Sequence, residues 1–273
     1  MKLADALREA ELLARSTQIP HADFLYLLSE LTGLNNMELL LERATELTDA
    51  QDEQWQQFSQ RRVEGEPSQY IIGKAYFYGM ELSVSPAVLI PRPETEGLVE
   101  LILQRTYPGQ RVLDIGTGSG AIALALKLIR PDLELTATDI SVHSIEVARM
   151  NAERLGLEID FREADLFPED GQRFDLIVSN PPYISASDYA LLPVHIREHE
   201  PKTALLAEED GLVYYRRILE LSSLHTNPGA MICFEIGAGQ SEQIKAIAKK
   251  QGLDRIEIKR DPAGLDRYVL INT

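Results

Sequence analysis

Apolar residues in the first 65 positions recur at the spacing of amphipathic helices. The pattern predicts helices over residues 2–15, 22–31, 37–43 and 48–63. The last of these begins at Thr48-Asp49-Ala50-Gln51, a sequence typical of a capping box. We therefore expect a small helical domain over residues 1–66, with Trp55 and Phe58 in its core or at a contact with a second domain.

The pattern changes after Gly65-Glu66-Pro67. Aromatic and β-branched residues punctuated by glycine and proline predict a linker over residues 67–92 that contains a β-hairpin. A helix over residues 94–105 follows, and from Arg111 onward strands alternate with helices, which is typical of a mostly parallel sheet covered on both faces. The expected strands span 111–116, 133–139, 158–164, 174–180, 229–236, 254–261 and 266–272, and the expected helices span 119–130, 142–155, 211–225 and 240–251. Residues 93–273 are thus predicted to form an α/β domain with a seven-stranded sheet.

Composition limits the classes of partner. Formal net charge is −16, from 43 acidic and 27 basic residues. Nucleic-acid affinity depends on cations that neutralise phosphates, so we expect no stable binding of nucleic acid, although a local basic patch around Arg61, Arg62 and Lys74 is compatible with the sequence. No apolar run reaches the roughly 20 residues that cross a bilayer, and the amino terminus does not resemble a secretory signal. We expect no membrane partner and a monomer.

Cysteine and histidine positions give no sign of a metal or a thiol nucleophile. The single cysteine, Cys233, lies in the apolar run Met231-Ile232-Cys233-Phe234 and is predicted to be a buried core thiol. One cysteine cannot form an internal disulfide, which favours a reducing cytoplasm. His195 and His199 are four residues apart, but no third ligand accompanies them, so we predict no metal site.

A glycine-rich turn follows the first strand of the α/β domain. Asp114-Ile115-Gly116-Thr117-Gly118-Ser119-Gly120 is a strand that runs into a turn and then into a helix. Glycines there permit positive φ and let a ligand lie against bare backbone, beside unpaired N–H groups at the helix start. The spacing is Gly-x-Gly-x-Gly, whereas dinucleotide-binding folds have Gly-x-Gly-x-x-Gly.

Carboxylates end the next two strands. Asp139 is placed to accept the hydroxyls of a ribose, and Asp165 precedes apolar groups, Leu166 and Phe167, that could bracket an adenine. Alternatively, the two aspartates cap the helices that follow. With the glycine turn, they resemble class I S-adenosylmethionine-dependent methyltransferases. This resemblance implies a Rossmann-like sheet and S-adenosyl-L-methionine as cofactor, with S-adenosyl-L-homocysteine as product.

Asn180-Pro181-Pro182-Tyr183 follows a predicted core strand, where prolines forbid the strand to continue. An amide or arylamine nitrogen is a poor nucleophile. The Asn180 side-chain oxygen and the Pro181 carbonyl can each accept one N–H of such a group, which aims it and raises its electron density. Tyr183 can stack on a planar group. The segment is similar to the motif of amino-methyltransferases, although a rigid turn at a strand end would also explain it.

The motifs together resemble the family of bacterial peptide chain release factor glutamine methyltransferases (the PrmC/HemK family). Besides the helical domain and the two motifs above, the likeness includes Ile90-Pro91-Arg92-Pro93-Glu94-Thr95-Glu96, Glu200-Pro201, Ala204-Leu205, Arg260-Asp261, Gly264 and Arg267. The resemblance implies N5-methylation of the glutamine in the Gly-Gly-Gln loop of class I release factors. The alternative is a nucleic-acid amino-methyltransferase, for example one that acts on adenine N6; a non-catalytic cofactor-binding protein is less compatible with the motifs.

The family likeness also implies residue roles. The cofactor would be held by a set made of the glycine turn, the strand-end acids and their neighbours: Gly116, Thr117, Gly118, Ser119, Gly120, Asp139, Asp165, Leu166 and Asn180. Asn180, Pro181 and Tyr183 would be catalytic. Together with Pro182 they would also bind the glutamine, and Arg92 and Glu94 either line the site or form a domain-joining ion pair. We further expect the segment from Ile184 to Glu209 to form part of the groove for the substrate loop.

Overall fold

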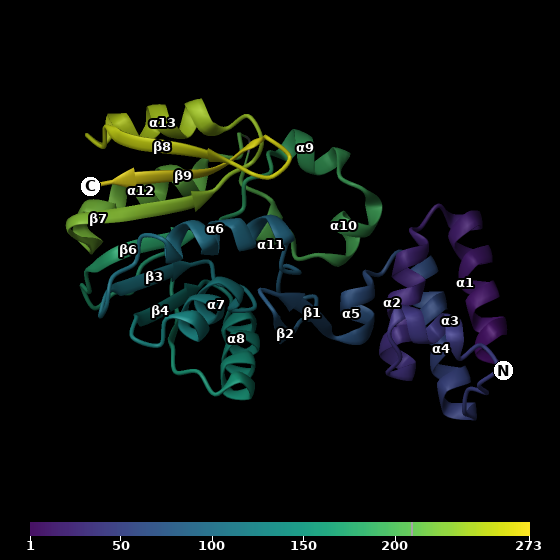
Figure 1. Cartoon of the computed structure of the whole chain (residues 1–273). Coiled ribbons are helices and arrows are strands. Elements are labelled where there is room, and N and C mark those ends of the chain that lie inside the picture. Colours follow the sequence, from purple (N-terminus) through teal and green to yellow (C-terminus); the bar gives the residue numbers. More distant parts are fainter. Residues whose placement is uncertain (209) are drawn as a thin grey trace. The chain divides into compact units, whose positions relative to one another are not determined.

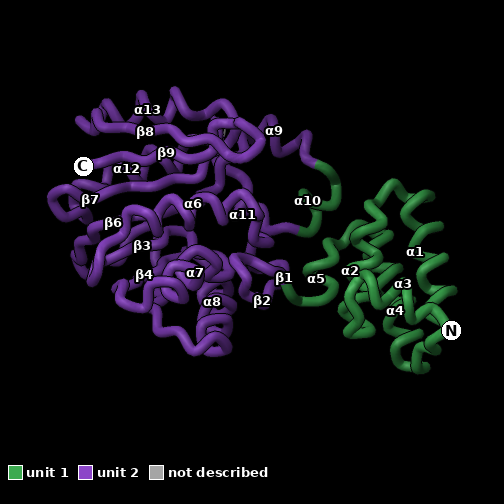
Figure 2. The backbone as a smooth tube through the Cα atoms, in the orientation of Figure 1, with its two compact units in different colours: residues 1–74, 193–199 green, residues 75–192, 200–273 purple. Residues whose placement is uncertain are grey.

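The computed structural model describes residues 1–208 and 210–273. The chain divides into two compact units, residues 1–74 with 193–199 and residues 75–192 with 200–273 (Figure 2). The predicted boundaries of the helical domain (1–66), the linker (67–92) and the α/β domain (93–273) stay predictions. No helix in the described part of the chain is long and apolar enough to cross a membrane.

The first unit is helical. It contains α1 (Leu3–Thr17), α2 (His21–Thr32), α3 (Asn36–Leu41), α4 (Asp49–Val63), α5 (Ser68–Ile72) and, from the separate segment, α10 (Val194–His199). The capping box at Thr48 is confirmed, since its hydroxyl accepts from Gln51 N–H and the Gln51 side chain accepts from Thr48 N–H. Trp55 is wholly buried among apolar residues of α1 and α2, and its Nε1 donates to Glu9 across 2.9 Å. This core holds the unit together.

The basic residues around which the sequence left a local patch possible are paired with carboxylates. Arg62 is buried and pairs with Asp23 at 2.7 Å, and Arg61 pairs with Glu66 at 2.6 Å. Lys74 lies 4.0 Å from Glu30. The three cations are therefore committed to ion pairs within the first unit.

The second unit opens with a hairpin and continues into the predicted sheet. Strands β1 (Lys74–Phe77) and β2 (Met80–Ser83) form a two-stranded sheet, and Lys74 is also the last residue of the first unit. The main sheet has the order β5-β4-β3-β6-β7-β9-β8, with β9 antiparallel to both neighbours and the other pairs parallel (Figure 1). Its strands are β3 (Arg111–Ile115), β4 (Glu134–Asp139), β5 (Asp160–Glu163), β6 (Phe174–Ser179), β7 (Thr226–Glu235), β8 (Arg255–Arg260) and β9 (Asp266–Asn272). The mostly parallel, seven-stranded α/β fold is confirmed.

Helices cover both faces of this sheet because alternate strand residues are apolar on opposite sides. Val112 and Val178 pack with α6 (Pro93–Leu103), α7 (Ala121–Ile129) and α8 (Val142–Leu155). Leu113 and Ile177 pack instead with α12 (Val213–His225) and α13 (Ser241–Lys250). Three short helices were not predicted within residues 184–206, namely α9 (Ala186–Leu191), α10 and α11 (Lys202–Leu205). Residues 70–72, expected in the hairpin, instead belong to α5.

The strand order reverses between β3 and β6. The chain runs outward from β3 to β4 and β5 and then returns to β6 on the other side of β3. In open α/β sheets, ligands bind in the crevice beyond the carboxyl ends of the strands at such a reversal. The topology therefore places the turn after β3 and the residues after β6 at the same binding edge.

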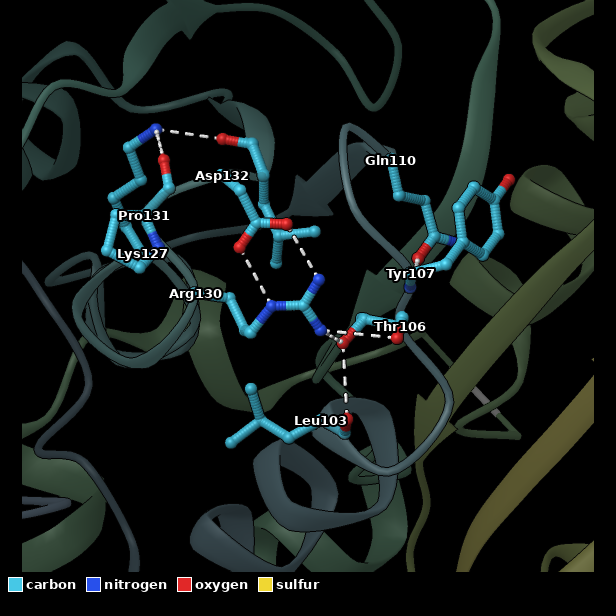
Figure 3. A network of polar contacts seen from close by, with 9 residues as sticks. Leu103, Thr106, Tyr107, Gln110, Lys127, Arg130, Pro131 and Asp132 are labelled. Carbon is cyan, nitrogen blue, oxygen red and sulfur yellow. Dashed lines mark hydrogen bonds and ion pairs between the residues drawn. The ribbon is translucent and has the colours of Figure 1, made fainter.

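Polar contacts fix the opposite edge, where β3 and β4 begin (Figure 3). Arg130, just after α7, donates to both oxygens of Asp132 at 2.8 and 2.7 Å and to Thr106 Oγ1 at 2.8 Å. Lys127 donates to the carbonyls of Pro131 and Leu133. These bonds hold the loop from α7 to β4 against Thr106, in the loop after α6.

Candidate functional site

A cavity of about 400 Å³ lies within the second unit, at the carboxyl edge of the sheet. Its walls come from the segment before α6, the turn after β3, the ends of β4 and β6, and parts of α11 and α12. Most of the predicted site residues line it: Arg92, Gly116, Thr117, Gly118, Ser119, Asp139, Asp165, Leu166, Asn180, Pro181 and Pro182. Gly120, Tyr183 and Glu94 are not among its lining residues.

The glycine turn combines an open face with a packed one. Gly118 has φ of 56°, and a Cβ built on it would meet nothing within 4 Å. A Cβ on Gly120, where φ is 85°, would lie 3.0 Å from Leu124 Cδ1 and 3.2 Å from Ala148 Cβ. Gly118 therefore leaves space for a ligand, whereas Gly120 permits close packing of α7 against α8.

Asp139 closes the turn from the neighbouring strand. Its Oδ2 accepts from Gly118 N–H and its Oδ1 accepts from Ser141 N–H, both across 2.9 Å. Burial raises the pKa of Asp139, and these two bonds act against that rise by stabilising the carboxylate. Since a carboxylate oxygen has more than one lone pair, both oxygens can still accept from a diol in the cavity.

The base of the turn is held by buried groups. Thr117 Oγ1 donates to Asp114 Oδ2 across 2.7 Å, and burial raises the pKa of Asp114 to about 7. The Thr138 carbonyl accepts from the N–H groups of Gly116 and Thr117. These bonds make the turn a preformed part of the sheet edge.

The third predicted position follows β5. Leu166 has φ of 74° and its carbonyl accepts from Thr138 Oγ1 across 2.7 Å, which fixes the backbone beside the cavity. Asp165 accepts from Arg217 Nη2 across 2.7 Å. The alternative that Asp139 and Asp165 serve as helix caps is not what the contacts show, because Ser141 is the N-cap of α8 and Asp165 pairs with α12.

Asn180 is held by a chain of three side chains. Its Nδ2 donates to Thr95 Oγ1 across 3.2 Å, and Thr95 Oγ1 donates to Glu235 Oε2 across 2.7 Å. Glu235 is buried, and burial raises its pKa to about 7, whereas the hydrogen bond from Thr95, the charge of Arg267 and a hydrogen bond from Asn180 lower that pKa. The first turn of α6 and the end of β7 thus control the residue that follows β6.

Tyr183 lies outside the cavity lining. Its side chain packs with the apolar cluster on the α12 and α13 face of the sheet, and burial raises its pKa. Its carbonyl accepts from Gln240 Nε2 across 3.0 Å, and Gly237 lies so near its ring that a Cβ there would be 3.0 Å from Cδ2. The predicted stacking of Tyr183 on a substrate amide stays a prediction.

Arg92 and Glu94 have different surroundings. Arg92 lines the cavity, and its Nη2 donates to both oxygens of Glu200, at 2.5 and 2.7 Å. Both residues belong to the second unit, so this pair does not join the two units. The Glu94 carbonyl accepts from Tyr268 Oη across 2.6 Å, and its side chain is not part of the lining. A substrate role for either residue stays a prediction.

Glu235 is the residue that sequence reasoning missed. It ends β7, one residue before the end of the predicted strand 229–236, at the same sheet edge as Asp139 and Asn180, so its position at a strand end was a signal that could have found it. Thr95 and Glu200 stood in segments used for the family likeness, but neither had a role assigned. Within the expected groove segment, Thr203 and Ala204 line the cavity, whereas Glu209 lies outside the described residues. No cluster of possible metal ligands occurs in the described part of the chain.

Comparisons with known proteins identify the family of the chain. Residues 94–196 match the model of the methyltransferase small domain, and residues 5–73 match that of the PrmC N-terminal domain. The release factor glutamine methyltransferase of Streptococcus pneumoniae is 40% identical over 100% of this chain and 99% of its own length. The release factor glutamine methyltransferase of Salmonella typhimurium is 40% identical over 96% of this chain and 95% of its own length. A solved methyltransferase from Pyrococcus furiosus, 21% identical, superposes with a TM-score of 0.54 over 71% of this chain and 89% of its own, which shows the fold.

Proposed function

The chain belongs to the release factor glutamine methyltransferase family, and we propose that its cavity is where methyl transfer to a glutamine side chain takes place. The methyl acceptor would be the N5 amide nitrogen in the Gly-Gly-Gln motif of class I release factors. The methyl donor would be S-adenosyl-L-methionine, which leaves as S-adenosyl-L-homocysteine. The observation that carries the proposal is that one cavity is lined by both the glycine turn and Asn180-Pro181-Pro182.

The residues present fit this donor. The open face at Gly118 leaves room for a ligand against the backbone, and the carboxylate of Asp139 can accept two ribose hydroxyls. Leu166 offers an apolar surface for an adenine, with Asp165 beside it. When bound, S-adenosyl-L-methionine supplies a methyl group already activated by its sulfonium.

The chain's own residues must then orient a weak nucleophile. The Asn180 Oδ1 and the Pro181 carbonyl would each accept one N–H of the glutamine amide, which aims the nitrogen lone pair and stabilises the positive charge that develops on it. The nitrogen would form the new N–C bond and lose one proton. The same two oxygens would accept this proton and pass it on to water. The prolines keep the carbonyl in place because their φ is fixed.

A protein substrate agrees with the charge of the chain. A net charge of −16 is unfavourable for a polyanion and compatible with a protein loop. We infer that residues 184–209 contribute to the groove for that loop and that the helical unit contacts the release factor farther from the glutamine. Action as a monomer in the cytoplasm, without stable nucleic-acid binding, completes the proposal.

Mass spectrometry tests the reaction directly. A purified, unmethylated release factor is incubated with this protein and S-adenosyl-L-methionine, and the peptide with Gly-Gly-Gln is mapped. The expected result is one added methyl group on the glutamine. Absence of transfer to either class I release factor, together with methylation of an adenine in DNA or RNA, would overturn the substrate assignment in favour of a nucleic-acid amino-methyltransferase.

A further inference from the structure

The parallel register of β6 and β7 brings Asn180 and Glu235 together. Ser179 pairs with Phe234 in this ladder, so the next residue of each strand emerges at the same level of the sheet edge. Thr95, in the first turn of α6, contacts both side chains, at 3.2 Å from Asn180 Nδ2 and 2.7 Å from Glu235 Oε2. Thr95 lines the cavity, whereas Glu235 lies behind it and is 2% exposed.

The number of available protons fixes which group donates in each of the two hydrogen bonds that link Asn180, Thr95 and Glu235. An ionised carboxylate only accepts hydrogen bonds, so the single hydroxyl proton of Thr95 is committed to Glu235. Thr95 Oγ1 then has only a lone pair available toward Asn180, so Asn180 must donate a hydrogen bond to it from its NH₂ group. A flipped amide would place Oδ1 against that lone pair with no proton between them. The Asn180 Oδ1 is therefore directed away from Thr95.

We propose that Thr95 and Glu235 are positioning residues that fix the Asn180 amide with its oxygen, rather than its NH₂ group, toward the substrate amide. This inference rests on the proposed function, because only an N–H-bearing substrate requires the oxygen to face it. An inverted Asn180 would present two donors to a group that needs an acceptor. The two residues act through Asn180 and do not themselves touch the glutamine.

The donor and acceptor roles in these two hydrogen bonds depend on the charge of Glu235. Once protonated, Glu235 can donate to Thr95 Oγ1, which frees the Thr95 proton. Its own hydrogen bond with the Asn180 side chain also weakens, because that bond favours the ionised carboxylate, so the constraint on Asn180 is relaxed. Burial raises the pKa of Glu235 to about 7, so this loss of constraint falls near neutral pH. The titratable and charged groups around Glu235 are Arg267, which favours its ionised form, Glu94, which opposes it, and the tyrosines Tyr183, Tyr215 and Tyr268.

Three threonine variants test the role in kinetics. Thr95→Val removes the hydroxyl at nearly constant volume, Thr95→Ser retains it, and Thr226→Val removes an equally buried hydroxyl that donates to Ser222 at the far end of β7. We expect Thr95→Val to lower kcat for release factor methylation by about 10- to 100-fold, with KM for the methyl donor unchanged. Thr95→Ser should restore kcat to within about threefold of wild type, because its hydroxyl can relay the same bond. Thr226→Val should keep the wild-type kcat.

Solution NMR gives a second readout that requires no turnover. The Asn180 side-chain amide signals are identified by their absence in Asn180→Asp. In the wild type they should shift between pH 5.5 and 8.5 with a midpoint near that of Glu235, and in Glu235→Gln the shift should disappear. A pH-independent Asn180 signal in the wild type, or a Thr95→Val kcat within twofold of that of Thr226→Val, would overturn the inference.

Failure of the proposed function has a different appearance. In that case the wild type does not methylate a release factor, yet the Asn180 amide still titrates with Glu235. If instead the wild type methylates the glutamine and the amide does not titrate, the function stands and the positioning role of Thr95 and Glu235 is wrong.

Discussion

The Asn180 Nδ2 donates to Thr95 Oγ1 across 3.2 Å, although the two residues are 85 positions apart in the chain. Thr95 belongs to the first turn of α6, before the sheet begins, and Asn180 follows its fourth strand in chain order. The bond joins the start of α6 to the residue after β6, so side chains from two distant parts of the second unit's sequence meet at the cavity.

Asn180→Ala tests the central role in the proposed chemistry. The side chain would supply one acceptor for the substrate amide, and loss of one such electrostatic contact lowers kcat by about 100- to 1,000-fold. Methylation of a release factor by the purified variant measures this loss. Asn227→Ala is a matched control, because Asn227 also uses its Nδ2 for one hydrogen bond, to Asp175, at the start of β7. Normal activity of a folded Asn180→Ala would remove Asn180 from the mechanism.

Comparison of Gly118→Ala with Gly156→Ala should distinguish the loss of space for a ligand from the effect of backbone strain on stability. Gly118 and Gly156 have φ of 56° and 65°, and a Cβ on either would meet nothing within 4 Å. Alanine at each position should therefore lower the free energy of unfolding by a similar amount, about 1–2 kcal/mol. Only the methyl group of Gly118→Ala would enter the cavity.

Titration calorimetry with S-adenosyl-L-methionine checks this expectation. Gly118→Ala should bind at least about tenfold more weakly than wild type, which corresponds to about 1.4 kcal/mol. Gly156→Ala should bind as the wild type does. Equal affinities of the two variants would mean that the donor does not lie against Gly118.

Asp139→Asn should open the glycine turn. Both Asp139 oxygens accept backbone N–H groups, from Gly118 and Ser141, so an amide in place of the carboxylate must turn a donor toward one of them. It also leaves only one oxygen for a ribose. We expect donor affinity to fall by about 10- to 100-fold, as for a lost hydrogen bond to a charged group, in the same calorimetric assay. Asp160→Asn, at an exposed pair with Arg162, is the control and should leave affinity unchanged.

Glu235→Gln should change how stability depends on pH. The pKa of Glu235 is about 7 in the folded protein against 4.5 in the unfolded chain. Because the folded value is the higher one, the wild type is most stabilised below pH 4.5 and loses that stabilisation as pH rises to about 7. Glutamine carries no charge, so the free energy of unfolding of Glu235→Gln relative to wild type should rise by about 2 kcal/mol between pH 5 and pH 8.

Urea unfolding of both proteins at several pH values measures that difference. Asp114, whose pKa burial also raises to about 7, titrates in the same range but is present in both proteins, so its contribution cancels. A constant offset at all pH values would show hydrogen-bond loss alone. Only an increase with pH reports the buried charge of Glu235.

The fold was predictable because its signals are local. Alternation of apolar runs with helical periodicity located all seven strands of the main sheet and the helices α6, α7, α8, α12 and α13. The short helices α9, α10 and α11 were not predicted; α9 and α10 bury no residue, so they lack an apolar face, and α11 has only four residues. Prolines and glycines around residues 65–73 were interpreted as the start of a hairpin, but Pro67 and Gly73 instead bound the short helix α5.

The cavity was predictable where each residue ends its own strand. Gly118, Asp139 and Asn180 share the carboxyl edge because parallel strands bring their ends together, so spacing along the chain was sufficient. The contacts of Thr95 with Glu235 and of Arg92 with Glu200 join segments 140 and 108 residues apart. Such pairs depend on how α6 and α11 pack at the sheet edge, which periodicity does not specify.

The reactivity of Cys233 can report on the opening of the sheet interior. It is the only cysteine in the sequence, it is wholly buried in β7, and burial raises the pKa of its thiol to about 12. Thiolate is the reactive form, so an alkylating reagent can modify the native protein only when β7 opens. The rate of alkylation therefore counts the openings of the strand that ends at Glu235. A cysteine introduced at an exposed position can be labelled beforehand without removing the native one.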